Sequence, residues 1–229
     1  MRAAKLAILP AVPPDRKPDA AELLAALPAP LRELAAQGTL RHYRANTTLI
    51  EEGDRGDSLF VVLSGSLRIF CADSGGREIT LAIYGPGEYV GEMSLDGGPR
   101  SASVSTEEAS VCAVVSGQSL RLHLAANPEF TLELIQRLIR RTRLATESAR
   151  SLALLDAYGR LVRLFDGLAV ARPDGTRVIT QRLTHREIAQ RIGCSRELVS
   201  RLLKDLQQGG YVALQAQRHA LLRKLPAKW

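Results

Sequence analysis

A glycine-rich stretch at residues 85–103 holds two side chains of opposite charge that suit a phosphorylated sugar. Glu92 follows Gly91, and Arg100 precedes Ser101. A carboxylate can accept a hydrogen bond from a ribose hydroxyl, while a guanidinium and free backbone N–H groups neutralise a phosphate. The chemistry therefore fits a cyclic nucleotide. On composition alone a glycine-rich hairpin with a surface ion pair is the more common interpretation, so these residues by themselves leave both open.

A second stretch, residues 183–206, has the pattern of a helix-turn-helix. Thr184 and Glu187 form the capping box T-x-x-E that starts a helix. Gly193 stands where the turn between two crossing helices favours positive φ, and Ser195 can cap the second helix. Apolar residues at helical spacing would face inward along that second helix, namely Leu198, Val199, Leu202, Leu203 and Leu206. The pair of glycines at residues 209–210 would end it.

The exposed face of that second helix would carry the side chains that read bases. Arg196, Glu197 and Arg201 lie on it, together with Ser200 and Lys204. Arginine can bind guanine bidentately, glutamate can accept from cytosine N4, and the N-terminal end of such a helix enters the major groove. The alternative is an ordinary helical hairpin with solvated arginines. Capping box, turn glycine, apolar spacing and local charge together favour DNA binding.

Residues 211–222 are expected to form a β-hairpin wing beside the helix-turn-helix. This wing would bring Arg218 and His219 near a DNA phosphate.

Charge is divided unevenly along the chain. Residues 157–229 carry 14 Lys and Arg against 5 Asp and Glu, a net charge of +9, whereas residues 1–156 carry 17 against 19, a net charge of −2 that completes the total of +7. This asymmetry is typical of a nucleic-acid-binding module joined to a neutral one. A merely well-solvated basic surface is the alternative that charge alone leaves open.

Composition and motifs disfavour several classes of protein. Hydrophobic residues make up 45% of the chain and charged residues 24%, as in a globular protein. No apolar run approaches the roughly 20 residues of a bilayer span, and prolines interrupt the apolar N-terminus where a signal peptide would lie. Cys71, Cys112 and Cys194 form no CxxC pair, so we expect reduced structural thiols in a cytoplasmic protein with no metal site. No P-loop, G-x-S-x-G or HExxH motif supports an enzyme.

The pattern of apolar, proline and glycine residues changes along the chain and indicates different secondary structure in each part. Prolines predict an irregular leader at residues 5–18, and residues 20–36 predict one or two short helices interrupted at Pro28 and Pro30. Between residues 39 and 115, β-branched or alternating runs separated by glycine turns predict an antiparallel barrel or jelly roll. Its clearest strands are expected at residues 58–64, 66–71, 78–84 and 110–115.

A long helix is expected to begin at Pro128, since proline is favoured in the first turn. Apolar and small residues recur along it at alternating spacings of three and four: Ile135, Leu138, Thr142, Ala145, Ala149 and Leu152. Such a seam predicts pairing with a second copy of the helix. Five arginines would keep much of the circumference polar, at positions Arg137, Arg140, Arg141, Arg143 and Arg150. The alternative is a helix packed only on its own domain.

Together these motifs resemble the cAMP receptor protein or catabolite activator (Crp/Fnr) family of bacterial transcription regulators. The resemblance covers roughly residues 39–222 and rests on residues 91–92 with 100–102, on a hinge-like segment at 152–160, and on residues 192–201. It implies an α+β fold with an N-terminal antiparallel β-roll (the cyclic-nucleotide-binding jelly roll), a long dimerisation helix and a C-terminal winged helix-turn-helix. The expected parts are a leader with short helices at 1–38, the β-roll at 39–126, the dimerisation helix at 127–157 and the DNA-binding domain at 158–229.

The resemblance also implies roles for individual residues. Those that would hold the ribose and cyclic phosphate are Gly91, Glu92, Arg100 and Ser101. The residues that match the family's base readers are Arg196, Glu197 and Arg201, and those that match its phosphate contacts are Thr184, His185 and Ser195. Because all three base readers match, half-sites of TGTGA type are implied. The implied partners are a double-stranded DNA operator, a second copy of the chain in a homodimer, and RNA polymerase.

Two departures from the family pattern bear on the ligand. The loop between Glu92 and Arg100 is shorter than in the enteric archetype. Where that archetype places two adjacent hydroxyl residues against the adenine, this sequence has Ala145 and Thr146, so one contact is missing. We expect a cyclic nucleotide as effector, cAMP in preference to cGMP, with cyclic di-GMP or ligand-independent DNA binding left open. Neither a haem nor an iron–sulfur cluster is expected.

Overall fold

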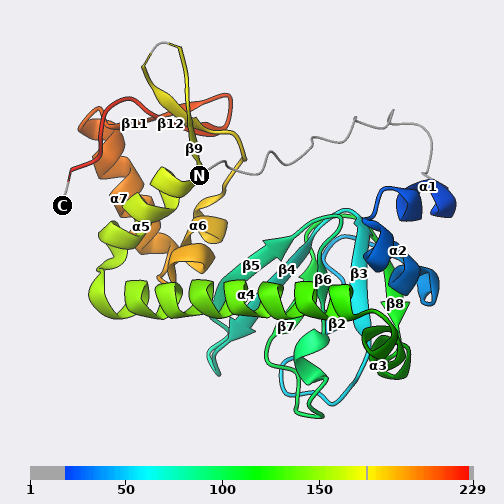
Figure 1. Cartoon of the computed structure of the whole chain (residues 1–229). Helices are drawn as coiled ribbons and strands as arrows, with labels where there is room; N and C mark the ends of the chain where they lie inside the picture. Colours follow the sequence, from blue (N-terminus) through cyan, green and yellow to red (C-terminus); the bar gives the residue numbers. More distant parts are fainter. Residues whose placement is uncertain (1–18, 174, 227–229) are drawn as a thin grey trace.

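The computed structural model describes residues 19–173 and 175–226, and the leader expected at residues 5–18 lies outside them. Two lobes are joined by one long helix (Figure 1). Two short helices precede the first lobe, α1 (Ala20–Ala25) and α2 (Ala29–Ala36), as expected. The break falls at Pro28, which caps α2, whereas Pro30 lies in the first turn of α2 and does not interrupt it. Proline lacks a backbone N–H, but the N–H groups in the first turn of a helix have no partner within the helix, so Pro30 breaks no hydrogen bond of α2.

Eight strands of the first lobe form two antiparallel sheets, with strand orders β1-β8-β3-β6 and β2-β7-β4-β5. Their bounds are β1 Thr39–Tyr43, β2 Thr48–Ile50, β3 Leu59–Ser64, β4 Leu67–Ala72, β5 Glu78–Tyr84, β6 Tyr89–Val90, β7 Ser103–Thr106 and β8 Ser110–Val115. Neighbouring residues of β3 face different cores: Val61 packs with residues of α2, α3 and α4, and Val62 packs with Leu67 and Cys112. Burial on both faces explains why β3 is a continuous apolar run. The predicted antiparallel β-roll is confirmed.

Helix α3 (Gly117–Ala126) leads into α4 (Pro128–Leu154), which runs across the first lobe to the second (Figure 1). Two stripes run along α4. Leu134 is buried in the first lobe and Leu138 packs against the same core. A separate exposed stripe follows the same alternation of three and four: Leu132, Ile135, Ile139, Thr142 and Thr146.

The residues of the predicted single seam lie on different stripes of α4, and their pairing with a second copy stays a prediction. Ile135 and Thr142 lie on the exposed stripe, whereas Leu138 packs on its own domain and Ala145 lines a cavity of that domain. Both stripes are apolar with helical spacing, so only packing against the β-roll distinguishes them.

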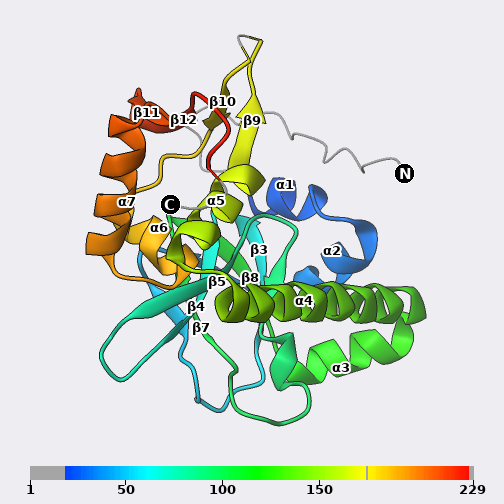
Figure 2. The ribbon, with the colours of Figure 1, turned by 90° about the vertical axis from the view of Figure 1, so that its left-hand side faces the viewer.

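The second lobe contains three helices and a small sheet of order β11-β12-β10-β9. The bounds are α5 Ala157–Leu168, β9 Ala169–Ala171, β10 Arg177–Ile179, α6 His185–Ile192, α7 Arg196–Gln208, β11 Val212–Gln215 and β12 Arg218–Leu221. The helix-turn-helix is α6 and α7, and the expected wing is β11 and β12. The hydrophobic core of the second lobe includes Leu161, Phe165, Ile188, Val199 and Leu203. In Figure 2 the sheet lies at one end of α7 and the β-roll at the other.

His219 of the wing corrects one expectation. Its side chain is 2% exposed, and its ring lies 5.5 Å from that of Phe165. It therefore belongs to the core of the second lobe and does not reach a DNA phosphate.

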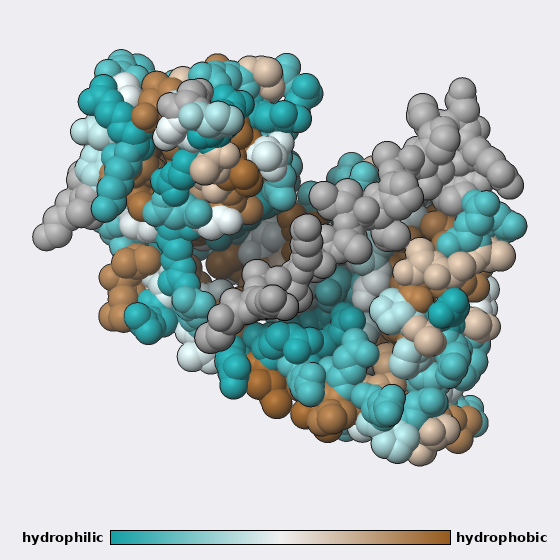
Figure 3. Space-filling model, turned by 45° about the horizontal axis from the view of Figure 1, so that its top comes forward, coloured by the Kyte–Doolittle hydropathy of each residue, from teal (hydrophilic) through white to brown (hydrophobic). Residues whose placement is uncertain are grey.

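The surface seen in Figure 3 is largely hydrophilic on both lobes, with apolar side chains in separate patches. Among the described helices, none is both long and apolar enough to cross a membrane.

Candidate nucleotide pocket and DNA-reading face

A cavity of about 490 Å³ lies between the β-roll and α4. It is walled by β5, by the turn after β6, by the loop before β7 and by one side of α4. Its polar lining comes from Tyr84, Glu92, Ser94, Arg100, Ser101, Arg141 and Ser148, and its apolar lining includes Ile69, Leu81, Val90, Leu144 and Leu152. A mostly apolar hollow with a few convergent polar groups is the usual form of a small-molecule site.

Gly91 and Glu92 form the first polar group of this cavity. Gly91 adopts a φ of 99°, and a Cβ there would lie 2.5 Å from the Ser58 carbonyl oxygen and 2.8 Å from Arg100 Nη1. Only glycine fits this position. The chain then turns through a short 3₁₀ helix, Glu92–Ser94, which buries the Glu92 side chain to 4% exposure. One carboxylate oxygen of Glu92 pairs with Arg141, while Oε2 is buried and has no hydrogen-bond partner among the described residues.

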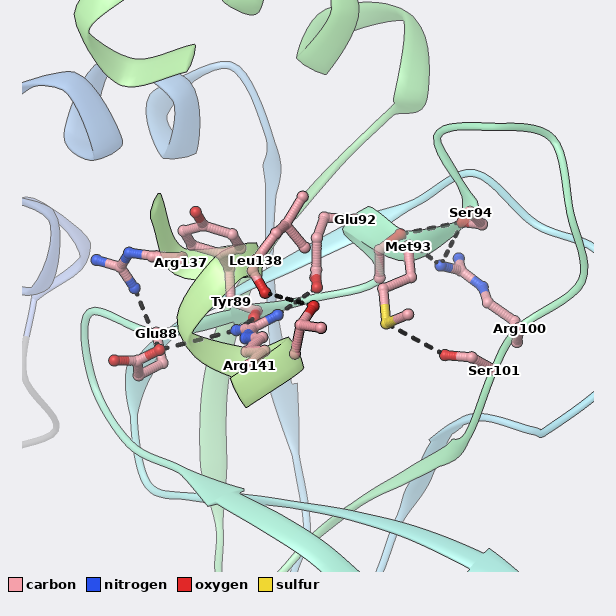
Figure 4. A network of polar contacts seen from close by, with 12 residues as sticks. Glu88, Tyr89, Glu92, Met93, Ser94, Arg100, Ser101, Arg137, Leu138 and Arg141 are labelled. Atoms are coloured by element: carbon pink, nitrogen blue, oxygen red, sulfur yellow. Dashed lines mark hydrogen bonds and ion pairs between the residues drawn. The ribbon is translucent and has the colours of Figure 1, made fainter. Parts of the chain in front are cut away.

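Arg100 forms the second polar group and is 8% exposed (Figure 4). Its Nη1 donates to the Gly91 carbonyl oxygen at 3.0 Å and to Ser94 Oγ at 2.9 Å, and its Nη2 donates to the Ser58 carbonyl oxygen at 2.9 Å. Burial lowers the pKa of Arg100, against the opposing influence of nearby carboxylates. These contacts hold the turn after β6 against the loop before β7. Nε of Arg100 makes no hydrogen bond to a described residue, so a phosphate would bind on the Nε side of the guanidinium or displace one of the protein acceptors.

Arg141 is a site residue that the sequence did not single out. Its guanidinium pairs with Glu92, donates from Nη2 to the Tyr89 carbonyl oxygen at 2.8 Å, and lies 4.6 Å from the centre of the Tyr84 ring. Burial alone would lower the pKa of Arg141, but Glu92, Tyr84 and Glu88 outweigh it, so the net pKa is raised.

Arg137, one turn earlier on α4, pairs with Glu133 at 2.9 Å and with Glu88 at 3.1 Å. The side chains of Arg137 and Arg141 are only 15% and 20% exposed, so these two of the five arginines lie on the side of α4 that packs against the β-roll. Their spacing of four residues, in register with Leu134 and Leu138, was the signal available in the sequence.

The α4 residues near the expected base position separate into two groups. Ala145 and Ser148 line the cavity, whereas Thr146 does not. The Thr146 hydroxyl donates to the Thr142 carbonyl oxygen at 2.9 Å within the helix. The predicted nucleotide contact of Thr146 stays a prediction. Ser101 lines the cavity, with its hydroxyl 3.4 Å from Met93 Sδ.

The helix-turn-helix has the local geometry that its sequence predicted. The Thr184 and Ser195 hydroxyls accept from the backbone N–H of Glu187 and Leu198, which starts α6 and α7, and Gly193 adopts a φ of 64° in the turn between them. An exposed face on α7 is lined by Arg196, Glu197, Ser200, Arg201 and Lys204. His185 lies beside this face, with Nδ1 2.8 Å from Ser200 Oγ. All six predicted DNA contacts therefore lie on α6, on α7 or at their N-terminal caps.

Both sites match known families in comparisons of the sequence. Residues 40–127 match the cyclic nucleotide-binding domain, and residues 159–227 match the Crp-like helix-turn-helix domain. The chain is 31% identical over 181 residues to the cAMP-activated global transcriptional regulator CRP of Salmonella typhimurium, over 76% of this chain and 85% of that protein. The chain belongs to the Crp/Fnr family. This Crp/Fnr protein is a cyclic-nucleotide-binding transcription regulator with a DNA-binding helix-turn-helix, as the motifs predicted.

Further relatives support the assignment to the Crp/Fnr family. The CRP-like cAMP-activated global transcriptional regulator of Mycobacterium tuberculosis is 33% identical over 174 residues, 74% of this chain and 78% of that protein. Among solved structures, the c-di-GMP responsive global regulator CLP of Xanthomonas campestris aligns with a TM-score of 0.74 at 28% identity, over 84% of this chain and 98% of that chain. The Thermus thermophilus catabolite activator protein aligns with a TM-score of 0.51 at 30% identity, over 88% and 94%.

Proposed function

We propose that this Crp/Fnr protein is a homodimer that binds cAMP in the cavity beside α4 and, when loaded, binds inverted DNA half-sites of TGTGA type. The observation that carries the ligand assignment is the buried Glu92 Oε2, which no described residue of the chain satisfies. A buried acceptor without a partner is unfavourable, and a ribose hydroxyl would satisfy it. Arg100 and Ser101 line the same cavity and would meet the cyclic phosphate.

The charge available in the cavity favours a mononucleotide. Arg100 is the one arginine in the lining that is not already paired with a carboxylate, because Arg141 is bound to Glu92. A cyclic dinucleotide carries two phosphates and about twice the bulk in a hollow of about 490 Å³. Cyclic di-GMP remains the second candidate, because the CLP regulator of similar fold responds to it.

The exposed stripe on α4 supports the homodimer. Leu132, Ile135 and Ile139 are 56%, 47% and 47% exposed, and the stripe continues through the small residues Thr142 and Thr146. Apolar residues that recur at alternating spacings of three and four along one side of a helix are typical of a coiled coil, in which that side is buried against a parallel copy. A two-fold dimer would present two α7 helices to successive major grooves.

The DNA face supports the half-site assignment. Arg196, Glu197 and Arg201 are exposed together at the N-terminal half of α7, where guanine and cytosine edges would be read. Regulation from such sites would bring the dimer to RNA polymerase, the partner that the family resemblance implied.

Fluorescence polarisation with a labelled duplex of two inverted TGTGA half-sites tests this proposal, using no ligand, cAMP, cGMP or cyclic di-GMP, with a scrambled duplex as control. We expect cAMP to raise affinity for the specific duplex more than the others do, and the nucleotide to be recovered intact. If only cyclic di-GMP raised the affinity, the ligand assignment would be wrong. Equal affinity in all four conditions would identify a constitutive DNA-binding protein instead.

A further inference from the structure

The first helix of the DNA-binding domain docks on β5, an edge strand of the nucleotide-binding domain (Figures 1 and 2). Gln190 of α6 donates from Nε2 to Glu78 Oε2 at 2.7 Å. The same oxygen accepts from Arg68 of β4, also at 2.7 Å. Arg68 in turn lies 3.4 Å from Glu107. A charged acceptor shared in this way holds the Gln190 amide in a defined position.

An apolar contact lies beside this hydrogen bond. A Cβ built on Gly193, the turn glycine of the helix-turn-helix, would lie 3.3 Å from Ile79 Cδ1 and 3.3 Å from Leu152 Cδ2. Ile79 belongs to β5 and Leu152 to the end of α4. The helix-turn-helix turn therefore rests directly on two elements that also form the nucleotide cavity.

One wall separates the nucleotide cavity from the junction with the DNA-binding domain. A hollow of about 380 Å³ at this junction is lined by residues of β5, α4, α5 and α6. Four residues line both this hollow and the nucleotide cavity: Leu81, Leu144, Ser148 and Leu152. A ligand that packs on one side of this wall acts on the position of β5 and α4, and α6 is fixed to β5 on the other side.

We propose that Glu78 and Gln190 are positioning residues that couple nucleotide binding to the placement of the DNA-binding domain within one chain. This inference rests on the proposed function, since it requires that ligand changes DNA affinity. The bound nucleotide shifts the position of β5, and the Glu78–Gln190 hydrogen bond makes α6, and hence α7, move with it. Loss of the bond leaves both binding sites intact but makes DNA affinity less responsive to ligand.

A charge exchange tests the contact. Gln190→Glu places two carboxylates in contact and separates α6 from β5. The double variant Glu78→Gln with Gln190→Glu restores a hydrogen bond, now with the amide on β5. Glu107→Gln is the matched control, because it removes the other carboxylate beside Arg68 without touching α6. For each protein, operator affinity is measured by polarisation with and without saturating cAMP, and cAMP affinity by calorimetry.

The measured quantity is the ratio of operator affinities with and without cAMP. Couplings of this kind are about 5- to 150-fold, and residues along a coupling route change them by about 2- to 30-fold. We expect Gln190→Glu to reduce the ratio by several-fold, with cAMP affinity and melting temperature close to those of the wild type, and Glu107→Gln to leave it unchanged. The double variant should recover most of the ratio. It carries the same new charge near DNA as the single variant, so recovery cannot come from removing repulsion by phosphates.

Two results would overturn the inference, and they are distinguishable. A wild-type ratio near one would refute the proposed allosteric function and this contact with it. If the wild-type ratio is well above one and Gln190→Glu has the same ratio, the coupling role of the Glu78–Gln190 contact alone would be refuted. The same conclusion would follow if the double variant failed to restore the ratio that Gln190→Glu had lowered.

Discussion

Arg141 and Glu92 form an ion pair although they lie 49 positions apart in the sequence. Arg141 comes from α4, the helix that carries the exposed apolar stripe, and Glu92 is the carboxylate of the nucleotide cavity. The pair fixes Glu92 Oε1, and Oε2 has no hydrogen-bond partner within residues 19–173 and 175–226. One contact therefore links the ligand acceptor to the helix on which the proposed dimer depends.

Arg141→Ala should weaken both stability and nucleotide binding. Removing one partner of a buried ion pair leaves an uncompensated charge and costs about 3–5 kcal/mol. Urea unfolding should show a loss of that order, and calorimetry should show weaker cAMP binding because Glu92 loses its fixed orientation. Arg140→Ala, an exposed arginine on the same helix, is the control and should change neither. Equal behaviour of the two variants would show that the ion pair has no role in the pocket.

Ile139→Glu should dissociate the proposed dimer, because it places a charge in the exposed stripe of α4. Leu138→Glu is the informative comparison, since Leu138 packs on its own β-roll and its loss should lower the melting temperature of the nucleotide-binding domain. Sedimentation at micromolar concentration, together with thermal unfolding, separates the two effects. A monomeric wild-type protein, or a dimeric Ile139→Glu variant, would contradict the assignment of this stripe.

Ser148→Ala and Thr146→Ala test which α4 hydroxyl reads the base. Ser148 lines the cavity and its hydroxyl has no hydrogen bond within the described part of the chain, whereas Thr146 lies outside the lining and bonds its own helix. Loss of one hydrogen bond from Ser148 should weaken cAMP binding by about 0.5–1.5 kcal/mol. It should also reduce the ratio of the affinity for cAMP to the affinity for cGMP. Calorimetry with both nucleotides measures this. A larger effect of Thr146→Ala would favour the adenine contact that the family resemblance implied for Thr146.

The helix-turn-helix could be predicted from the sequence because its signals are local. Thr184 and Glu187 are three residues apart, and the structure has the capping box, the positive φ of Gly193 and the Ser195 cap. Gly91 and Glu92 were singled out by the family resemblance, and Gly91 must be glycine because a Cβ there would meet the Ser58 carbonyl oxygen and Arg100, which lie far away in the sequence. The capping residues and turn glycine of the helix-turn-helix could be predicted because local backbone requirements restrict the residue types at neighbouring positions.

The parts of the site that sequence could not give depend on distant packing. Nothing near Arg141 in the sequence indicates that it meets Glu92, because the pair exists only after α4 lies across the β-roll. The two stripes of α4 have the same spacing, so the expected seam alternated between them, with Leu138 on one and Ile135 on the other. His219 has a polar side chain, yet it is buried against Phe165 in a short strand whose next two residues, Ala220 and Leu221, are also buried, so no alternation in the sequence marks it as inward.

His219 should make the DNA-binding domain less stable at acidic pH. Burial lowers its pKa below the ordinary value of 6.5, assisted by His185 and opposed by the Leu183 carbonyl. The unfolded chain then binds the proton more readily, so stability is full above about pH 6.5 and falls as pH decreases, by at most about 1.4 kcal/mol per pH unit, until the folded-state pKa is passed. Urea unfolding between pH 8 and 5 measures the slope. His219→Gln should flatten it, and an unchanged slope would assign the effect to other groups.

Arg201→Ala and His185→Ala should affect DNA binding in different ways, because the two residues are expected to contact different parts of the duplex. Arg201 lies on the exposed face of α7, so its loss should weaken binding to the specific site by about 1–3 kcal/mol and relax preference at one base pair. His185 lies beside that face and is expected at a phosphate, so its loss should weaken binding to all sequences alike. Competition with duplexes substituted at each position, repeated at several salt concentrations, separates base reading from backbone contact. Sequence preference that survives Arg201→Ala unchanged would show that a different part of the protein reads the operator.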